Sequence, residues 1–228
     1  MKKAQHILIA TPLQEEYDDL HNSLSTHGLK SVKGTIGKLD IHRFPELNVI
    51  LARGGHGKTQ FGVQTQHLLD LEKFALVICA GAAGALHSDV RIGDLIVATQ
   101  TFEHDYNNKF SQRPKPQFEG HVESVEQIQA LKLDVDFKIH YGVIASGDED
   151  VIEFERAQEL RAMCNAIGVA WEGVGGARAS KFSSVPYLEL RGATDTANHE
   201  APAIFYDNLK IVMKNMAALL VPWLRSLP

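Results

Sequence analysis

Apolar runs recur along the chain and alternate with segments that have helical spacing. Six of the runs are short, rich in Val, Ile and Leu, and continuously apolar, which is typical of strands covered on both faces. The strands predicted in this way cover residues 6–10, 49–52, 76–80, 95–98, 139–146 and 187–192.

The intervening segments place apolar residues three and four positions apart, as one face of a helix does. The first of them begins just after Thr11-Pro12, where proline suits a first helical turn. A shorter segment, residues 32–44, has Gly34 and Gly37 as turn residues and predicts a hairpin. The expected helices cover residues 13–24, 59–71, 151–166, 171–182 and 206–227.

The alternation of strands and helices predicts an α/β fold: a three-layer single domain with a central mixed, largely parallel twisted sheet flanked by helices. No repeat or linker divides the 228 residues, so we expect one domain over residues 1–228. A polar, proline-containing stretch, residues 105–120, is the one long loop expected. Because ligands of such folds bind where strands end, we expect the ligand-binding residues at the ends of the predicted strands.

Composition and charge exclude several classes of partner. The formal net charge is −5 and no run of Lys and Arg occurs, so nucleic acid is not an expected partner. The longest apolar stretch, residues 74–84, is much shorter than the about 20 residues of a membrane span, and we expect no signal peptide. Cys79 and Cys164 stand outside any metal or redox spacing and predict free thiols in a soluble cytoplasmic protein.

Two glycine-rich segments follow predicted strands. Gly-Gly-His-Gly-Lys at residues 54–58 lets backbone approach a ligand or a phosphate, or forms only a tight turn, and it lacks Walker spacing. Residues 80–85 lack the GxGxxG spacing of nicotinamide-dependent oxidoreductases, so close helix–strand packing competes with ligand binding there. The eleven histidines show no HExxH or similar spacing, and neither a metal nor a cofactor is expected.

Three carboxylates stand where strands end or helices begin. Asp195 follows an apolar strand, where a carboxyl group in a cleft can act as an acid; an N-cap or turn role is the alternative. Glu172 is the lone acid of an apolar, small-residue segment, and a buried Glu is rarely kept without a partner or a function. Glu16 lies in a first helical turn, where acids commonly balance the helix dipole, so it is a functional candidate only if it faces the cleft.

The order and spacing of these motifs resemble the purine nucleoside phosphorylase and nucleosidase superfamily, and within it the 5′-methylthioadenosine/S-adenosylhomocysteine nucleosidases. The resemblance covers nearly the whole chain. It implies a nucleoside as the small-molecule partner and a homodimer or larger homo-oligomer, in which the loop at residues 103–110 reaches a neighbouring pocket. It rests on residues 7–10, 15–16, 55–58, 81–86, 90–94, 146–148, 171–173 and 191–198.

The resemblance implies a role for each matching residue. Asp195 corresponds to the acid that protonates the purine ring nitrogen, and Glu172 to the Glu that binds the ribose hydroxyls. Glu16 corresponds to the Glu that activates the attacking water, and Arg191 to an Arg near that water. The remaining substrate-binding residues are expected to be Leu13, His56, Gly81, Ala82, Glu149, Asp150, Val151, Trp171 and Phe205.

The same motifs bear on hydrolysis against phosphorolysis. Phosphorylases of this group carry a Gly-Asp-Pro loop and an Arg that hold phosphate, and the position of that Arg is Cys79 here. Glu16 would repel phosphate and orient water, so hydrolysis is expected and a phosphate-dependent phosphorylase is the alternative. Ala82 and Ala170, where the family has Ser and Glu, favour a further alternative, a catalytically weak nucleoside-binding homologue.

Departures near the base and the sugar leave the substrate open. Family nucleosidases have an apolar, aromatic-containing stretch where this chain has Glu149-Asp150-Val151. Acids there can accept hydrogen bonds from a ring N–H or an exocyclic amine, which suits a 6-oxopurine better than adenine. Trp171 replaces a Met under the sugar, and His56 replaces an apolar residue. The expected substrate is a methylthioadenosine/adenosylhomocysteine-like or a 6-oxopurine nucleoside.

Overall fold

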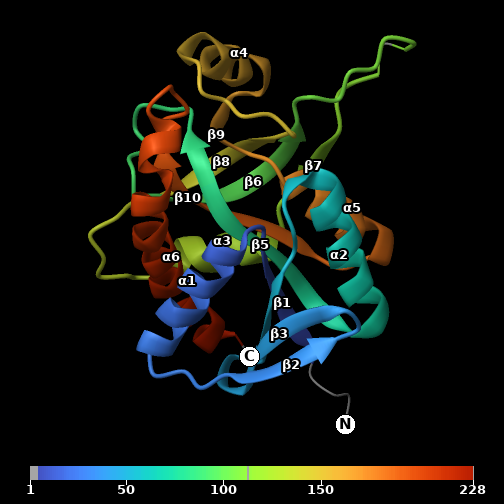
Figure 1. Cartoon of the computed structure of the whole chain (residues 1–228), viewed down its shortest axis with the longest axis vertical. Helices are drawn as coiled ribbons and strands as arrows, with labels where there is room; N and C mark the ends of the chain where they lie inside the picture. The colour runs from blue at the N-terminus through green and yellow to red at the C-terminus, as the bar shows by residue number, and fades with distance from the viewer. Residues whose placement is uncertain (1–4, 112, 228) are drawn as a thin grey trace.

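The strands of the computed structural model, which describes residues 5–111 and 113–227, form one mixed sheet (Figure 1). Its strands are β1 (His6–Thr11), β2 (Val32–Ile36), β3 (Leu39–Phe44), β4 (Val49–Arg53), β5 (Phe74–Ala85), β6 (Leu95–Glu103), β7 (Gln117–Glu119), β8 (Ile139–Ser146), β9 (Ala166–Ala170) and β10 (Tyr187–Asp195). The helices are α1 (Gln14–Thr26), the 3₁₀ turn η1 (Pro45–Leu47), α2 (Gly57–Leu71), α3 (Val122–Ala130), α4 (Phe154–Cys164), α5 (Gly173–Ser183) and α6 (Ala201–Ser226).

The strand order brings the ends of several parallel strands to one place. The order is β10-β6-β8-β9-β5-β1-β4-β3-β2, with β7 on β6. Strand β10 also pairs with β5, so β5, β9, β8, β6 and β10 close into a ring. Strands β4, β1, β5 and β10 run parallel to their neighbours in that series. Their carboxyl ends therefore meet at one edge, where the first turns of several helices begin.

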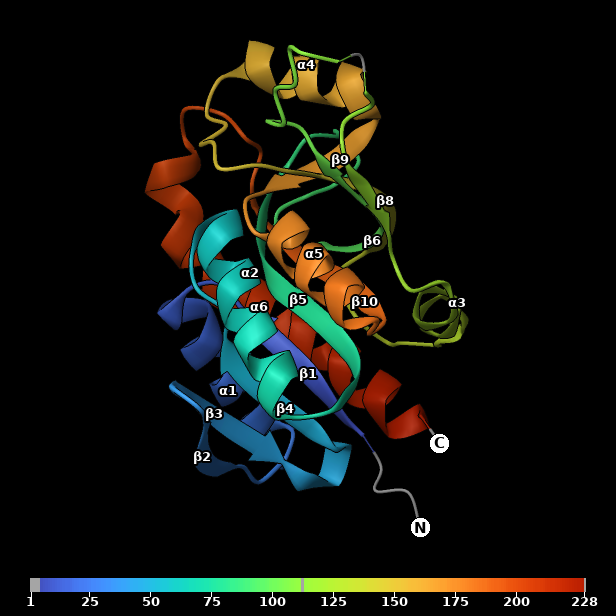
Figure 2. The same ribbon diagram turned by 90° about the vertical axis from the view of Figure 1, so that its right-hand side faces the viewer.

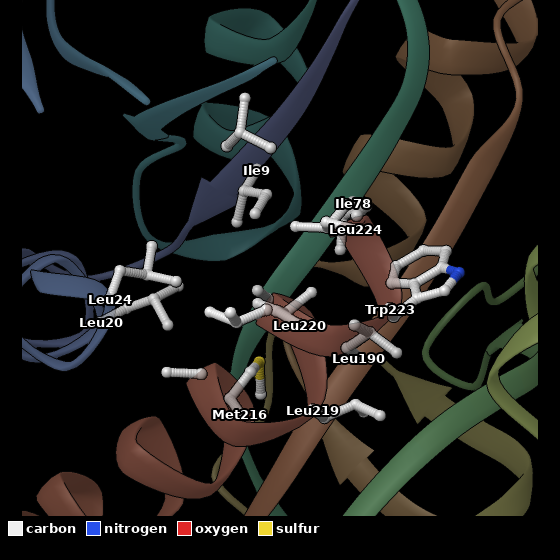
Figure 3. Close-up of a cluster of buried hydrophobic side chains, with 14 of the residues drawn as sticks. Ile9, Leu20, Leu24, Ile78, Leu190, Met216, Leu219, Leu220, Trp223 and Leu224 are labelled. Carbon is white, nitrogen blue, oxygen red and sulfur yellow. The ribbon is translucent and has the colours of Figure 1, made fainter. Parts of the chain in front are cut away.

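Helices cover both faces of the sheet. Helices α1 and α6 lie on one face, and α2 and α5 lie together on the other (Figures 1 and 2). The larger apolar cluster joins Ile9 and Leu190 of the sheet to Leu220 and Trp223 of α6 (Figure 3). Helix α3 packs on the same side, where the indole N–H of Trp223 donates to Gln127. Helix α4 packs against β8 and β9 at one end of the molecule.

This architecture confirms the predicted α/β class with a central mixed sheet flanked by helices. The hairpin at residues 32–44 is present as β2 and β3. The prediction of a helix over residues 151–166 was wrong at both ends, since α4 begins at Phe154 and a strand, β9, follows it. Strand β9 was missed because its five residues, all apolar or glycine, are too few to show the alternation of apolar and polar positions that distinguishes a strand from a helix.

Two further elements differ from the expectation. Helix α3 was not predicted at all, although its Val125 and Ile128 are buried against α6. The loop at residues 105–120 contains a short strand, β7, that pairs with β6. Across the described ranges no helix is long and apolar enough to cross a membrane.

Candidate active site

A cavity of about 400 Å³ lies at the carboxyl ends of β5 and β10, beside the first turns of α1 and α6. Its wall combines residues from far-apart parts of the chain, because the parallel strands end together there. Twelve of the thirteen residues that the sequence singled out line it: Leu13, Glu16, His56, Ala82, Glu149, Asp150, Val151, Trp171, Glu172, Arg191, Asp195 and Phe205.

Gly81 is the exception: it lies outside the described cavity lining, and its substrate-binding role stays a prediction. It was expected after the end of a strand over residues 76–80, but β5 continues to Ala85 and pairs Gly81 with Arg191. A Cβ at Gly81 would lie 2.8 Å from Arg191 Nη1 and 2.9 Å from Glu16 Oε1. Gly81 therefore lies behind the cavity wall, where the lack of a side chain lets Glu16 and Arg191 approach each other.

Asp195 is the last residue of β10 and is held by hydrogen bonds to both carboxylate oxygens. The register of β10 against β5 shifts between Ala193 and Asp195, and such an irregularity redirects a side chain at a strand end. The Thr194 hydroxyl donates to Oδ2 at 2.8 Å, and the Ala197 N–H donates to Oδ1 at 2.9 Å. The carboxyl group is thus oriented but still reaches the cavity.

Glu172 stands between two cationic groups and a helix terminus. Its Oε1 accepts from the Gly57 N–H at 3.1 Å, and Gly57 has a φ of +77° that favours glycine at the start of α2. Its Oε2 lies 3.3 Å from both Nη atoms of Arg191. Burial alone raises the pKa of Glu172, but His56, Arg191 and the Gly57 N–H stabilise the carboxylate and bring its pKa below the usual value. Glu172 is therefore a fixed anion on the cavity wall.

His56 and Trp171 form a stacked pair beside Glu172. Their ring centroids lie 4.3 Å apart at an interplanar angle of 30°. His56 Nδ1 lies 3.3 Å from Glu172 Oε1, and the hydrogen bond between them raises the pKa of His56. The two residues that depart from the family pattern around the sugar are thus in contact with each other, and one of them touches the carboxylate expected to bind ribose.

Glu16 is buried in the first turn of α1 and faces the cavity, as its functional interpretation requires. Its Oε1 accepts from the Ala82 N–H and its Oε2 from the Leu13 N–H, each at 2.7 Å. Burial raises the pKa of Glu16 to about 7, and the nearby charge of Glu172 adds to the rise. The Arg191 guanidinium and the two N–H donors act in the opposite direction. A carboxyl group that titrates near neutral pH can accept a proton from water.

Arg191 is buried and holds the acids of the site together. Its Nη1 donates to the Ala82 carbonyl at 3.1 Å, and both Nη atoms face Glu172. Its Nε donates to Glu189 at 2.7 Å, and Nη2 lies 3.4 Å from the Cys79 sulfur. Glu189 was missed by sequence reasoning, although a charge two residues before Arg191 in a strand falls on the same face.

The acids expected beside the base differ in their environment. Both oxygens of Glu149 accept from Arg156, Oε1 from Nε at 2.6 Å and Oε2 from Nη2 at 2.8 Å. Arg156 lowers the pKa of Glu149. Asp150 is exposed at the cavity rim. Of the two, Asp150 is therefore the one whose carboxylate is available to a base.

The lysine of the glycine-rich segment at residues 54–58 is engaged by two carboxylates and does not reach the cavity as a phosphate ligand would. Lys58 Nζ donates to Glu103 at 3.0 Å and also to Asp105. Its backbone N–H donates to Asp148 at 2.8 Å, which caps the start of α2. Within the described ranges no group of three or more His, Cys, Asp or Glu side chains could hold a metal ion.

Several further residues line the cavity without having been given a catalytic or substrate-binding role. They come from the segments next to the predicted motifs, mainly the end of β5, the loop before α4 and the start of α6. Thr194 and Ala83 could have been predicted, because they lie within the motifs at residues 191–198 and 81–86. These residues are Pro12, Ala83, Gly84, Ile152, Val169, Ala170, Thr194, Ala201, Pro202 and Tyr206.

Known proteins resemble this chain over nearly its full length. A 5′-methylthioadenosine/S-adenosylhomocysteine nucleosidase from Tolumonas auensis is 26% identical over 224 residues, which are 94% of each chain. The nucleosidase of the same name from Helicobacter pylori has a TM-score of 0.88 at 26% identity and covers 99% of this chain and 100% of that one. Futalosine hydrolase from Helicobacter pylori has a TM-score of 0.86 at 26% identity and covers 98% of each chain. The sequence profile of the phosphorylase superfamily matches residues 6–225, and the chain belongs to that superfamily.

Proposed function

We propose that this protein is an N-glycosyl hydrolase that releases the base of a purine-type nucleoside. Asp195 protonates the base, Glu172 binds the ribose hydroxyls and Glu16 activates water. The observation that carries the proposal is that three carboxylates in three different environments line one cavity. The nucleosidase and hydrolase names of the similar proteins support the same reaction class.

The proposed reaction breaks the bond between the anomeric carbon and the base nitrogen. Asp195 donates a proton to the purine ring, so the bonding electron pair leaves with a neutral base. The sugar gains cationic character, which the Glu172 carboxylate stabilises through the ribose hydroxyls. A water oxygen attacks the anomeric carbon while Glu16 takes the water proton. The products are the free base and the free sugar.

Two of the three acids, Glu172 and Glu16, have environments that fit their proposed parts. Glu172 is kept ionised by Arg191, His56 and the Gly57 N–H, which suits a group that faces a developing positive charge. Glu16 titrates at about 7, which suits a base that must gain and lose a proton. Arg191 holds Glu172 directly, and Arg191 and Glu16, both in the cavity wall, lie next to Gly81.

For the substrate we propose a methylthioadenosine/adenosylhomocysteine-like or a 6-oxopurine nucleoside. Arg156 engages Glu149, so Asp150 at the rim is the acid proposed to accept a hydrogen bond from the base. The stacked pair of His56 and Trp171 is proposed to lie under the sugar and its 5′ substituent. Leu13, Val151 and Phe205 supply apolar wall around them.

A nucleoside panel with and without phosphate tests this function. Base release from 5′-methylthioadenosine, S-adenosylhomocysteine, futalosine and inosine is measured in phosphate-free buffer. We expect release from at least one of them at a rate that added phosphate does not raise. Release that requires phosphate would make the protein a phosphorylase. Binding without release across the panel would make it a nucleoside-binding homologue.

We further propose that the protein acts in the cytoplasm as a homodimer or larger homo-oligomer and that residues 1–228 form one domain. The side chain of Phe110, in the loop expected to reach a neighbouring pocket, is fully exposed. Phe154 and Phe182 are also largely exposed, as apolar residues at a subunit interface are in an isolated chain. Light scattering of the purified protein tests the assembly, and a monomer would contradict it.

A further inference from the structure

One buried carboxylate beside the site has no part in the proposed reaction. Glu189 lies in β10 two residues before Arg191 and is completely buried. Its Oε1 accepts from Arg191 Nε at 2.7 Å, and its Oε2 accepts from the Thr101 hydroxyl. It lies behind Arg191, outside the residues that line the described cavity. An ionised group without access to solvent is costly to keep, so its charge calls for an explanation.

The charges around Arg191 give that explanation. Arg191 is the one Arg or Lys that lines the described cavity, so an anionic nucleophile would have to bind there. Glu172 faces its two Nη atoms and Glu189 binds its Nε. When Glu16 carries a proton, the charges of Glu172 and Glu189 together balance those of Arg191 and a protonated His56. Without the charge of Glu189 the cluster would be one unit more positive, so Glu189 opposes the entry of a phosphate ion.

We propose that Glu189 is a specificity-determining residue that selects water over phosphate as the nucleophile by neutralising Arg191 from behind. The inference rests on the proposed hydrolysis and extends it to a residue that touches neither substrate nor water. Holding the guanidinium in place would not require a charge. A neutral amide of the same shape can accept from Arg191 Nε and donate to the Thr101 oxygen, so both hydrogen bonds would remain.

Removing this charge is expected to admit phosphate. In the Glu189→Gln variant the charges of Arg191 and His56 are opposed by Glu172 alone, and an inorganic phosphate ion can bind Arg191. A phosphate oxygen then attacks the anomeric carbon as the bond to the base breaks, and Asp195 again supplies the proton that leaves with the base. The sugar product changes from the free sugar to the sugar 1-phosphate.

The test compares wild type, Glu189→Gln and a control, Thr101→Val, which removes a hydrogen bond of Glu189 but leaves its charge. Calorimetry measures the affinity for inorganic phosphate, and ³¹P NMR detects sugar 1-phosphate formed from the best nucleoside substrate. We expect Glu189→Gln to bind phosphate about tenfold more tightly than wild type and to form sugar 1-phosphate. Wild type and Thr101→Val should form free sugar alone.

Two results would overturn the inference. One is a folded Glu189→Gln variant whose phosphate affinity is within about twofold of wild type and which forms free sugar alone. The other is an equal gain in phosphate affinity in Thr101→Val. If Glu189→Gln fails to fold, Glu189→Met, of similar volume and also uncharged, takes its place with the same deciding outcomes. Should wild type release no base from any nucleoside, the proposed function fails, whereas the phosphate affinities still decide this inference.

Discussion

The two faces of β10 are equally buried but chemically opposite. Leu188 and Leu190 point into the apolar cluster under α6, which contains Trp223 (Figure 3). Glu189 and Arg191 point the other way, toward the cavity wall and the start of α5. Every residue of the strand is buried, so burial does not separate the two faces.

The difference lies in what each face requires of its neighbours. Apolar side chains on the α6 face need only matching volume, because their stabilisation comes from area removed from water. Each polar atom on the other face needs its own partner, since an unpaired buried charge is strongly destabilising. The charged face therefore adds little to stability and is explained by the chemistry at the end of the strand.

The largest effect on the rate of base release should come from Asp195, the last residue of β10. Asp195→Asn keeps the shape of the side chain but removes the proton that the base needs, so base release should fall about 10²- to 10⁴-fold. Steady-state kinetics with the best nucleoside measures this, and circular dichroism checks that the fold is intact. A variant that keeps more than about a tenth of wild-type activity would show that Asp195 is not the acid.

A substitution on the apolar face of β10 should lower the free energy of unfolding and leave the rate of base release unchanged. Leu190→Ala removes a fully buried side chain from the cluster under α6 and should lower the free energy of unfolding by about 2–5 kcal/mol. Urea unfolding measures this, and kcat/KM well below the melting temperature should stay close to wild type. A large loss of kcat/KM with little loss of stability would mean that the two faces are not separate in role.

Glu16, which lies next to Arg191, should make the free energy of unfolding depend on pH. Burial raises its pKa from 4.5 to about 7, so the folded protein binds this proton more tightly than the unfolded chain. Its contribution to stability is therefore fully present below about pH 4.5 and is lost as the pH rises through about 7. Over that range wild type should lose about 3 kcal/mol of unfolding free energy relative to Glu16→Gln. Urea unfolding of both proteins across this range measures the difference.

The same titration should appear in the kinetics. If Glu16 accepts the proton of water, kcat/KM of wild type should rise with pH through a midpoint of about 7. The Glu16→Gln variant should retain only a small residual rate without that rise. A wild-type profile that is flat between about pH 5.5 and 8.5 would contradict the role of Glu16 as the base.

The smallest effect is expected at the cavity rim. His56→Phe preserves an aromatic ring on Trp171 but removes the hydrogen bond to Glu172, so KM should rise up to about tenfold with a smaller change in kcat. His56→Ala, which also removes the stacking partner, is the matched comparison and should raise KM further. An unchanged KM in His56→Phe would mean that His56 does not position Glu172.

The sequence predicted the parts of the molecule that have a local signal. The buried strands and the carboxylates at strand ends followed from apolar runs and motif spacing, and twelve of thirteen expected residues line the cavity. Strand β9 and helix α3 did not follow, because their patterns are short and their partners come from distant parts of the chain. The strand before Gly81 was predicted to end at Ala80 for a related reason: the small residues that follow carry little apolar signal, although β5 continues through them.

Contacts between distant residues explain what else escaped prediction. The pairing of Lys58 with Glu103 joins residues 45 positions apart, whereas that of Glu149 with Arg156 joins the loop before α4 to the first turn of that helix. The stack of His56 on Trp171 joins the motifs at residues 54–58 and 171–173, and nothing in the sequence indicates that they touch. Glu189 carried a readable signal, a charge in an apolar strand at the spacing of one face, but its partner Thr101 lies on another strand.

Oxygen labelling tests the central claim, hydrolysis at this cavity, most directly. The enzyme cleaves its best nucleoside in H₂¹⁸O with phosphate present, and the released sugar is reduced at once with borohydride and analysed by mass spectrometry. Attack by a water that Glu16 activates predicts one ¹⁸O at the former anomeric carbon of every released sugar. An unlabelled sugar 1-phosphate as the product would contradict the account.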